Sequence, residues 1–286
     1  MSPDPIFSKA KQISMSAKLW LRLDRFCRIG VSWDRESKLN GLLVLVGAML
    51  VWELAARLEI VNPLFFPAMS KILRSFFALV ISGDIPGQIL MSMKRAAAGY
   101  LLAAIVFVPL GVIMGLFERV YRMLEIIIET ARPIPPPVIV PVAMLFFGLG
   151  DAMKIFVIFF SCAWPILLNT VDGVRNIDRV LIHTFRTFGL SRGRAIPKVI
   201  LPAASPQIMT GLRISLAITL ILVVISEMIG SSDGIGYFIL DSQRRFKVDQ
   251  MYAGMLSLAL LGYLLNLLFL AATNTLLSWH RGMTGR

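Results

Sequence analysis

The residue types that catalyse reactions or bind metals are few and widely separated in this sequence of 286 residues. The two cysteines, Cys27 and Cys162, form no CxxC pair, and the two histidines, His183 and His280, lack the spacing of a metal site. The sequence contains no nucleophile–base set and no phosphate-binding GxxxxGK[ST] motif. We therefore expect no catalytic residue, no metal ion and no cofactor, and we interpret Cys162 as a small core residue.

One carboxylate, Glu227, follows the long apolar run Ile218–Ile225. A carboxylate at membrane depth is costly and usually faces a helix bundle or water, so Glu227 is a candidate residue of a substrate pathway. The alternative is a position at the external membrane surface, with hydrogen bonds to the turn at Ser231–Gly234. No Lys or Arg occurs from Ile214 through Tyr237, so a charged partner must come from another helix or from a neighbouring subunit.

A basic stretch, Asp172–Arg213, lies between two apolar blocks. Asn176 and Asp178 can cap a helix start, and Gly189 can end the helix in the left-handed conformation. Between them, Arg179 and Arg186 avoid the face that carries the apolar side chains Leu181, Phe185 and Phe188. The pattern predicts a short amphipathic helix whose apolar face has no partner in its own segment.

The end of this stretch contains prolines that indicate a break. We expect the loop segment to end at Leu201-Pro202 and a new helix to start with Ser205 as its cap and Pro206 in its first turn.

Long apolar blocks dominate the sequence, which is 57% hydrophobic and 16% charged with a mean hydropathy of +0.75. Because a helix needs about 20 apolar residues to cross a membrane, we expect an all-α polytopic membrane protein with about six transmembrane helices. The expected spans are Gly41–Leu58, Ala96–Phe117, Val138–Phe147, Ile155–Val171, Ile208–Ile229 and Met251–Leu277. The third of these is too short to cross a membrane unless it is extended back to near Leu124. Its prolines at 133–141 should then kink it inside the bundle.

Small and polar residues within these spans are expected at contacts between helices, where small residues let backbones approach and polar side chains bond across helices. The small positions are Gly99, Gly111 and Gly115, and the polar ones are Asn169, Ser215, Thr219 and Asn266. Between the first two spans, Asn62–Gly87 is interpreted as an external connection with one short helix.

The net charge of +12 would indicate nucleic-acid binding in a soluble protein, but in a polytopic membrane protein Lys and Arg gather in cytoplasmic loops. Residues 1–40, the central loop and the end of the chain have an excess of Lys and Arg, whereas Asp residues accompany the Lys and Arg of the other loops. All three segments are therefore predicted to be cytoplasmic. Residues 1–40 form a separate basic segment, either an amphipathic helix on the membrane or a solvated tail. Residues 41–286 form the transmembrane domain, and the central loop covers 172–205.

The central loop resembles the cytoplasmic loop of permeases of ATP-binding-cassette (ABC) importers, whose signature is E-A-A, three residues, G, nine residues, I-x-L-P. Gly189 matches the glycine, and Val199, Leu201 and Pro202 stand in the I-x-L-P positions, whereas His183, Thr184 and Phe185 replace E-A-A. Four flanking segments, which add to the resemblance to the nitrate/sulfonate/taurine branch, are Arg132–Pro136, Phe146–Gly150, Pro165–Asn176 and Ser226–Tyr237. The resemblance covers about Pro63 to Leu270.

The resemblance implies a permease subunit in the bacterial inner membrane with several partners. These are ABC-type ATPase subunits, an extracytoplasmic solute-binding protein that delivers a small solute, and a second permease copy, usually identical. The ATPase would dock on the central loop, through His183, Phe185, Arg186, Phe188, Gly189, Val199, Leu201 and Pro202. The alternative is a secondary transporter or channel without ATP, for which the sequence offers neither paired intramembrane charges nor an inverted repeat.

The charge distribution generates a test of topology. A cysteine introduced at Ser191 should be protected from an impermeant thiol reagent in intact cells and become labelled after the cells are permeabilised, because the central loop is predicted to be cytoplasmic. Labelling in intact cells would overturn the predicted orientation.

Overall fold

The computed structural model describes residues 35–178, 180–181, 187 and 192–277, and every regular element within them is a helix. The chain divides into two units, Met1–Pro63 and Leu64–Arg286, which are described separately. In the first unit, α2 (Arg35–Arg57) contains most of the first expected span. That α2 crosses a membrane stays a prediction.

The second unit holds the remaining helices. They are α3 (Met69–Ile81), α4 (Asp84–Leu116), α5 (Glu118–Ala131), α6 (Pro136–Phe147), α7 (Asp151–Arg175), α9 (Arg192–Ala195), a π-helical turn (Ile196–Ile200), α10 (Leu201–Gly230), α11 (Ile235–Arg244) and α12 (Val248–Leu276). Among the described residues, four helices are long and apolar enough to cross a membrane: α4, α7, Gly193–Gly230 and α12. They contain the fourth and fifth expected spans and, except for the last residue of each, the second and the sixth, and α3 is the expected short helix between spans.

The third expected span differs from a kinked helix, because α5 and α6 meet at a bend of 97° and form either a broken span or a re-entrant loop. The reason is local. The residue before a proline is disfavoured in the helical conformation, and Pro135, which precedes Pro136, is extended with φ −62° and ψ 126°, so the chain leaves the helix before α6. Pro136 and Pro137 then occupy the first turn of α6, where a missing N–H group costs nothing. Counting this pair as one span gives five in the described residues.

The expected break at Leu201-Pro202 is wrong, since the helix continues from Gly193 to Gly230. The turn at Ile196–Ile200 has π geometry, and a π turn is wider than an α turn. Pro202 then lies in the first turn of α10. The Ser205 hydroxyl donates to the Pro202 carbonyl at 2.8 Å inside the helix rather than capping a new one.

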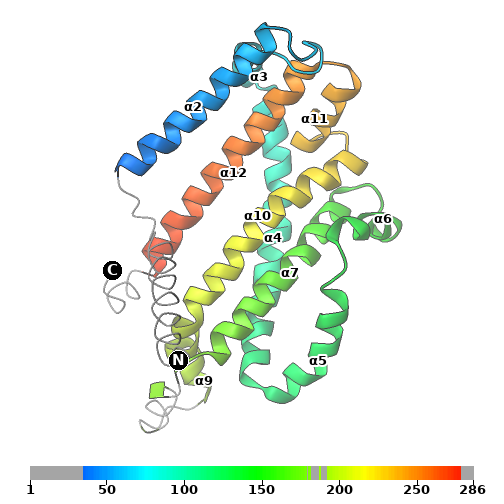
Figure 1. The fold of residues 1–286 in the computed structure, drawn as a ribbon. Helices are drawn as coiled ribbons and strands as arrows, with labels where there is room; N and C mark the ends of the chain where they lie inside the picture. Colours follow the sequence, from blue (N-terminus) through cyan, green and yellow to red (C-terminus); the bar gives the residue numbers. More distant parts are fainter. Residues whose placement is uncertain (1–34, 179, 182–186, 188–191, 278–286) are drawn as a thin grey trace, which may run out of the picture. The chain divides into compact units, whose positions relative to one another are not determined.

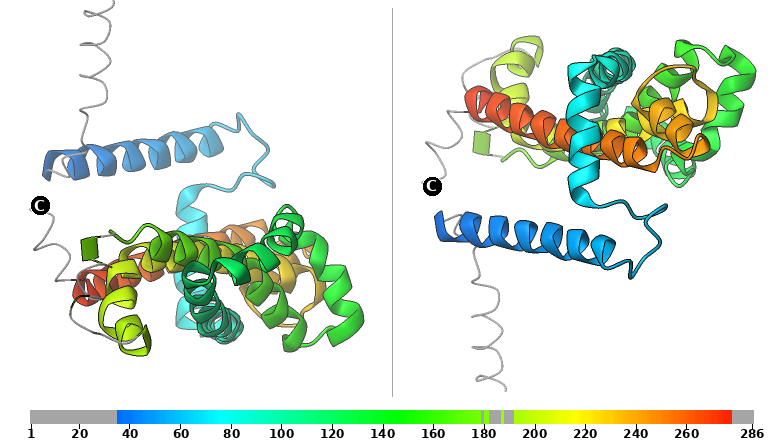
Figure 2. Two further views of the ribbon diagram at one scale, coloured as in Figure 1. Left: turned by 90° about the horizontal axis from the view of Figure 1, so that it is seen from below. Right: turned by 90° about the horizontal axis from the view of Figure 1, so that it is seen from above.

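The core of the second unit is built around α7, which packs against both α4 and α10 (Figures 1 and 2). Glycines of α4 make the first contact close. A Cβ atom at Gly99 would lie 2.7 Å from Ile158 Cβ, one at Gly111 2.7 Å from Thr170 Cβ, and one at Gly115 2.6 Å from Val174 Cβ. The expected close-packing role of these glycines is confirmed.

Polar side chains join α7 to α10 as expected. The Ser215 hydroxyl donates to the Cys162 carbonyl at 3.2 Å, and the Cys162 thiol lies 3.1 Å from the Thr219 hydroxyl. Cys162 is fully buried. The Asn169 amide oxygen accepts from Gln207, and the Asn266 oxygen of α12 accepts from Arg213 of α10.

Helix α12 is less buried than the other three long apolar helices, since its buried residues are only Ala253, Gly254 and Ser257. A groove of about 550 Å³ opens between α12 and α10, and aliphatic side chains line most of it. The structural core that positions the polar residues is therefore α4, α7 and α10.

The close α4–α7 contact generates a prediction. Gly99→Ala should lower the thermal stability of the purified protein by roughly 1–3 kcal/mol, because the new methyl group meets Ile158 and the Ile155 carbonyl. The matched control is Gly87→Ala in the same helix, where nothing lies within 4 Å of the new Cβ. Equal melting temperatures for the two variants would contradict this packing.

Candidate functional site

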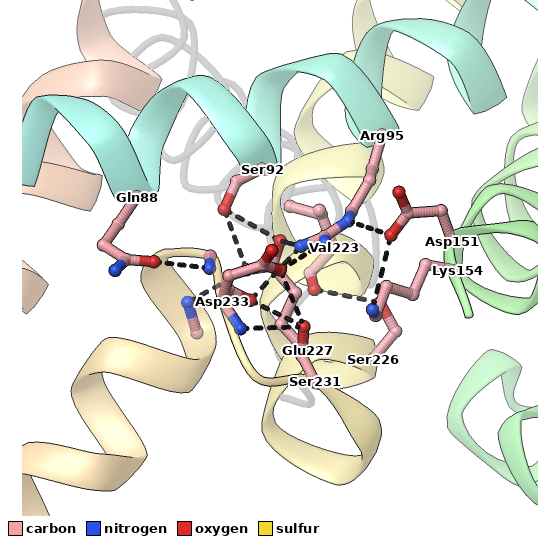
Figure 3. A network of polar contacts seen from close by, with 12 residues as sticks. Gln88, Ser92, Arg95, Asp151, Lys154, Val223, Ser226, Glu227, Ser231 and Asp233 are labelled. Carbon is pink, nitrogen blue, oxygen red and sulfur yellow. Dashed lines mark hydrogen bonds and ion pairs between the residues drawn. The ribbon is translucent and has the colours of Figure 1, made fainter. Parts of the chain in front are cut away.

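Five charged side chains meet where α4, α7, α10 and the turn before α11 come together (Figure 3). We call Arg95, Asp151, Lys154, Glu227 and Asp233 the charge cluster. Arg95 comes from α4, Asp151 and Lys154 from the first turn of α7, Glu227 from the last turn of α10, and Asp233 from the following turn. Segments far apart in the sequence thus supply one polar site.

Glu227 is the most enclosed member, with no exposed surface. Its carboxylate accepts hydrogen bonds from Arg95 Nη1 at 2.9 Å, from the Ser92 hydroxyl at 2.8 and 2.9 Å, and from the Gly236 backbone N–H at 3.0 Å. A buried carboxylate is tolerated when its oxygens are paired and hydrogen-bonded in this way.

Arg95 connects the other helices to this carboxylate. Its side chain is 5% exposed, and its Nε donates to Asp151 Oδ1 at 2.7 Å. Nη1 also donates to the Asp233 carbonyl at 3.2 Å, and Nη2 donates to the Asp233 carboxylate. This bond to the Arg95 guanidinium holds the pKa of Asp233 below its usual value.

The turn after α10 closes over Glu227 because it contains glycine. Gly234 has a φ of +101°, and a Cβ atom there would lie 2.3 Å from the Glu227 carboxyl carbon. A Cβ atom at Gly236 would lie 2.5 Å from the Val224 carbonyl. Helix α4 holds the same turn, since Gln88 accepts from the Gly234 N–H at 2.6 Å and Ser92 accepts from the Ile235 N–H at 2.8 Å. Any larger residue at 234 would displace the carboxylate.

Lys154 differs from Arg95 in how it is paired. Its side chain is 3% exposed, and its ammonium lies 3.6 Å from Asp151 Oδ1, beyond the usual 2.7–3.2 Å of an N–H···O hydrogen bond. Asp151 itself is 58% exposed. One accessible carboxylate therefore lies between two buried cations.

The structure places Glu227 inside the bundle, which was the favoured interpretation of the sequence, and the backbone N–H group that it bonds belongs to Gly236 in the first turn of α11 rather than to the turn Ser231–Gly234. Its charged partner comes from another helix, as expected. That Glu227 belongs to a substrate pathway stays a prediction. In the described residues, no group of three or more His, Cys, Asp or Glu side chains has the arrangement of a metal site.

Only part of the predicted ATPase-docking segment can be placed. Val199, Leu201 and Pro202 lie in the π turn and the start of α10, and Asp178 accepts from the Val180 N–H at 2.8 Å as a cap. Asn176 instead ends α7. The five others, which lie outside the described residues, are His183, Phe185, Arg186, Phe188 and Gly189.

Leu201 packs on an apolar cluster that joins the three core helices. Its buried members are Val112 of α4, Val174 of α7, Ile177, and Ile200, Ala204 and Ile208 of the helix from 193 to 230. Nearby, Arg175 at the end of α7 pairs with Glu118 at the start of α5 and stacks over Tyr121. The end of the central loop is therefore anchored in the core at the end opposite the charge cluster.

The sequence analysis did not identify Arg95 or Lys154 as candidate site residues. The structure buries both. Two signals were available: Ser92 and Arg95, and Asp151 and Lys154, are each spaced i,i+3, which puts each pair on one helix face. The segment Ser226–Tyr237 also concentrates Glu227, Asp233 and two of the glycines of the site.

Known proteins resemble this chain in sequence and in fold. The family model described as binding-protein-dependent transport system inner membrane component matches residues 107–278. The chain is 31% identical to the putative aliphatic sulfonates transport permease protein of Bacillus subtilis, over 88% of this chain and 91% of the relative. It is 32% identical to the bicarbonate transport system permease protein of Synechococcus elongatus, over 81% of this chain and 88% of the relative. An inward-facing structure of the MetNI methionine ABC transporter shares the fold, with a TM-score of 0.58 and 20% identity over 67% of this chain and 94% of that one.

The buried ion pair generates a prediction. Arg95→Met should destabilise the protein by roughly 3–5 kcal/mol, because it leaves the Glu227 carboxylate buried without its charge partner. The double variant Arg95→Met/Glu227→Gln should recover part of that loss, since the unpaired charge is gone. Thermal unfolding of the purified variants measures both, with exposed Lys94→Met as the control. A double variant less stable than Arg95→Met would show that the pair does not carry the effect.

Proposed function

Because the chain belongs to the family of binding-protein-dependent transport system inner membrane components, and is the permease subunit of an ABC importer, we propose that it forms a pathway for a small anion together with a second copy of itself. The family match over residues 107–278 is the observation that carries the function, because it includes the central loop and most of the charge cluster. A transporter without ATP is thereby set aside.

The energy for transport comes from separate ATPase subunits in this proposal. The sequence has no GxxxxGK[ST] motif with which to hold ATP itself. The docking surface is the amphipathic segment with Phe185, Phe188 and Gly189, and it continues into Val199, Leu201 and Pro202. Support comes from the continuous helix 193–230, whose start packs on the apolar cluster with Leu201. A displacement of the loop would be passed to α10 as a rigid element.

The substrate is proposed to be a small anion because relatives are named for aliphatic sulfonates and for bicarbonate. An extracytoplasmic binding protein would deliver it to the end of the permease that carries the charge cluster. Both termini and the central loop would then lie in the cytoplasm, as the Lys and Arg distribution requires. The chain would move its substrate without chemical change.

Glu227 is proposed to act in the outer gate of the pathway. It joins α4 to α10 through Arg95, and the turn with Gly234 closes over it. Any separation of α4, α7 and α10 at this end must break ion pairs with Arg95. The gate would therefore open only when the ATPase or the substrate supplies the free energy.

Docking is tested with Gly189→Val. A β-branched residue tolerates the left-handed conformation poorly, at a cost of about 1–3 kcal/mol, so the loop helix would end wrongly and co-purification of the ATPase should fall while membrane abundance is kept. Gly193→Val is the matched control, because a Cβ there meets nothing within 4 Å. Wild-type yield of the ATPase and wild-type uptake in Gly189→Val would refute docking at this site.

The gate is tested with Glu227→Gln, scored for uptake and for substrate-stimulated ATP hydrolysis in the assembled complex. We expect both to change more than membrane abundance does, since Gln fits the space but leaves Arg95 with one carboxylate fewer. Glu129→Gln, on the exposed face of α5, is the control. If both activities equal those of the wild type, Glu227 has only a structural role.

A further inference from the structure

The unusual member of the charge cluster is Lys154, a buried ammonium without close pairing. Its three N–H donors have one ionic contact among the described residues, at 3.6 Å from Asp151. Burial of an ammonium group costs several kcal/mol unless close ion pairs and hydrogen bonds offset it. In an otherwise well-bonded cluster this cation has capacity for another acceptor.

Arg95 shows the contrast. It already has Glu227 at 2.9 Å, the Asp233 carboxylate and the Asp233 carbonyl as partners, in addition to Asp151. If Asp151 moved away, Arg95 would keep two carboxylates, whereas Lys154 would lose its ionic contact. Asp151 is thus needed by Lys154 more than by Arg95.

The position of Lys154 adds to its positive potential. It is the fourth residue of α7, close to the helix N-terminus, where the helix dipole already favours an anion and disfavours a cation. Asp151, the first residue of α7, supplies that anion, and it can leave because its side chain is 58% exposed and glycines stand at 148 and 150 before it. The second cation, Arg95 Nε, donates to the same Asp151 oxygen at 2.7 Å.

We propose that Arg95 Nε and Lys154 Nζ form an anion-binding site of the transport pathway, in which Asp151 is a resident counter-ion that an oxyanion displaces. The proposal rests on the proposed function as a permease for a small anion. A sulfonate or carboxylate headgroup has oxygens enough to accept from both cations at hydrogen-bond distance, which Asp151 does only for Arg95. The site would select for negative charge at the outer end of the pathway.

The test uses the full-length permease purified as a complex with its ATPase. Thermal stability is measured while methanesulfonate replaces chloride at constant ionic strength. The wild type should gain stability with methanesulfonate, and Lys154→Gln should lose this gain while Lys154→Arg keeps it. Lys94→Gln, the exposed neighbour of Arg95, should respond like the wild type.

Asp151→Asn gives the opposite result to Lys154→Gln and remains informative if the latter does not fold. Without the competing carboxylate, the concentration of methanesulfonate for half the effect should fall roughly tenfold, as one hydrogen bond to a charged group is enough for that factor. An unchanged or higher concentration in Asp151→Asn, or an undiminished gain in Lys154→Gln, would overturn the site. Failure of the ATPase to co-purify with the wild type would instead overturn the proposed function.

Discussion

The guanidinium of Arg95 is the charge on which this end of the molecule depends. A buried cation must be neutralised, and here the neutralising groups come from α7, α10 and the turn before α11. The requirement for pairing therefore determines which helices meet and how closely. It also explains the glycine at 234, because only a residue without a side chain leaves room for the Glu227 carboxylate beneath the turn.

The three core helices link this cluster to the opposite end of the bundle. Glycines at 99, 111 and 115 bring α4 against α7, and Gly211 of α10 lies against the Pro165 carbonyl and Asn169 of α7. Such contacts leave little freedom for one helix to slide on another. A shift of the π turn and of Leu201 would then be carried along α10 toward Glu227. Packing alone would in this way connect the proposed ATPase contact to the proposed outer gate.

Prolines show how much of the structure followed from local chemistry. The prolines at 133–137 were expected to interrupt a helix and do so, but as a bend of 97° rather than a kink. Leu201-Pro202 was expected to end a segment, and the helix instead passes through it with a π turn. Local preference predicts that a proline disturbs a helix. Here the packing of Ile200, Leu201 and Ala204 on α4 and α7 stabilises the continuous helix instead.

The sequence by itself determined the helical fold, the positions of four long apolar helices and the close-packing glycines, since each depends on hydrophobicity or residue size along one helix. It also indicated that Glu227 lies inside the bundle, because the carboxylate follows a long apolar run. It also carried the family resemblance through Gly189, Val199, Leu201 and Pro202. Only the tertiary structure decided that Arg95 and Lys154 are buried. The sequence does not distinguish an exposed Arg or Lys from a buried one, because the difference lies in the residues that surround the side chain in space. It alone brought Asp151 between the two cations, since residues 95, 151 and 227 are separated by long stretches of chain and meet only when three helices pack.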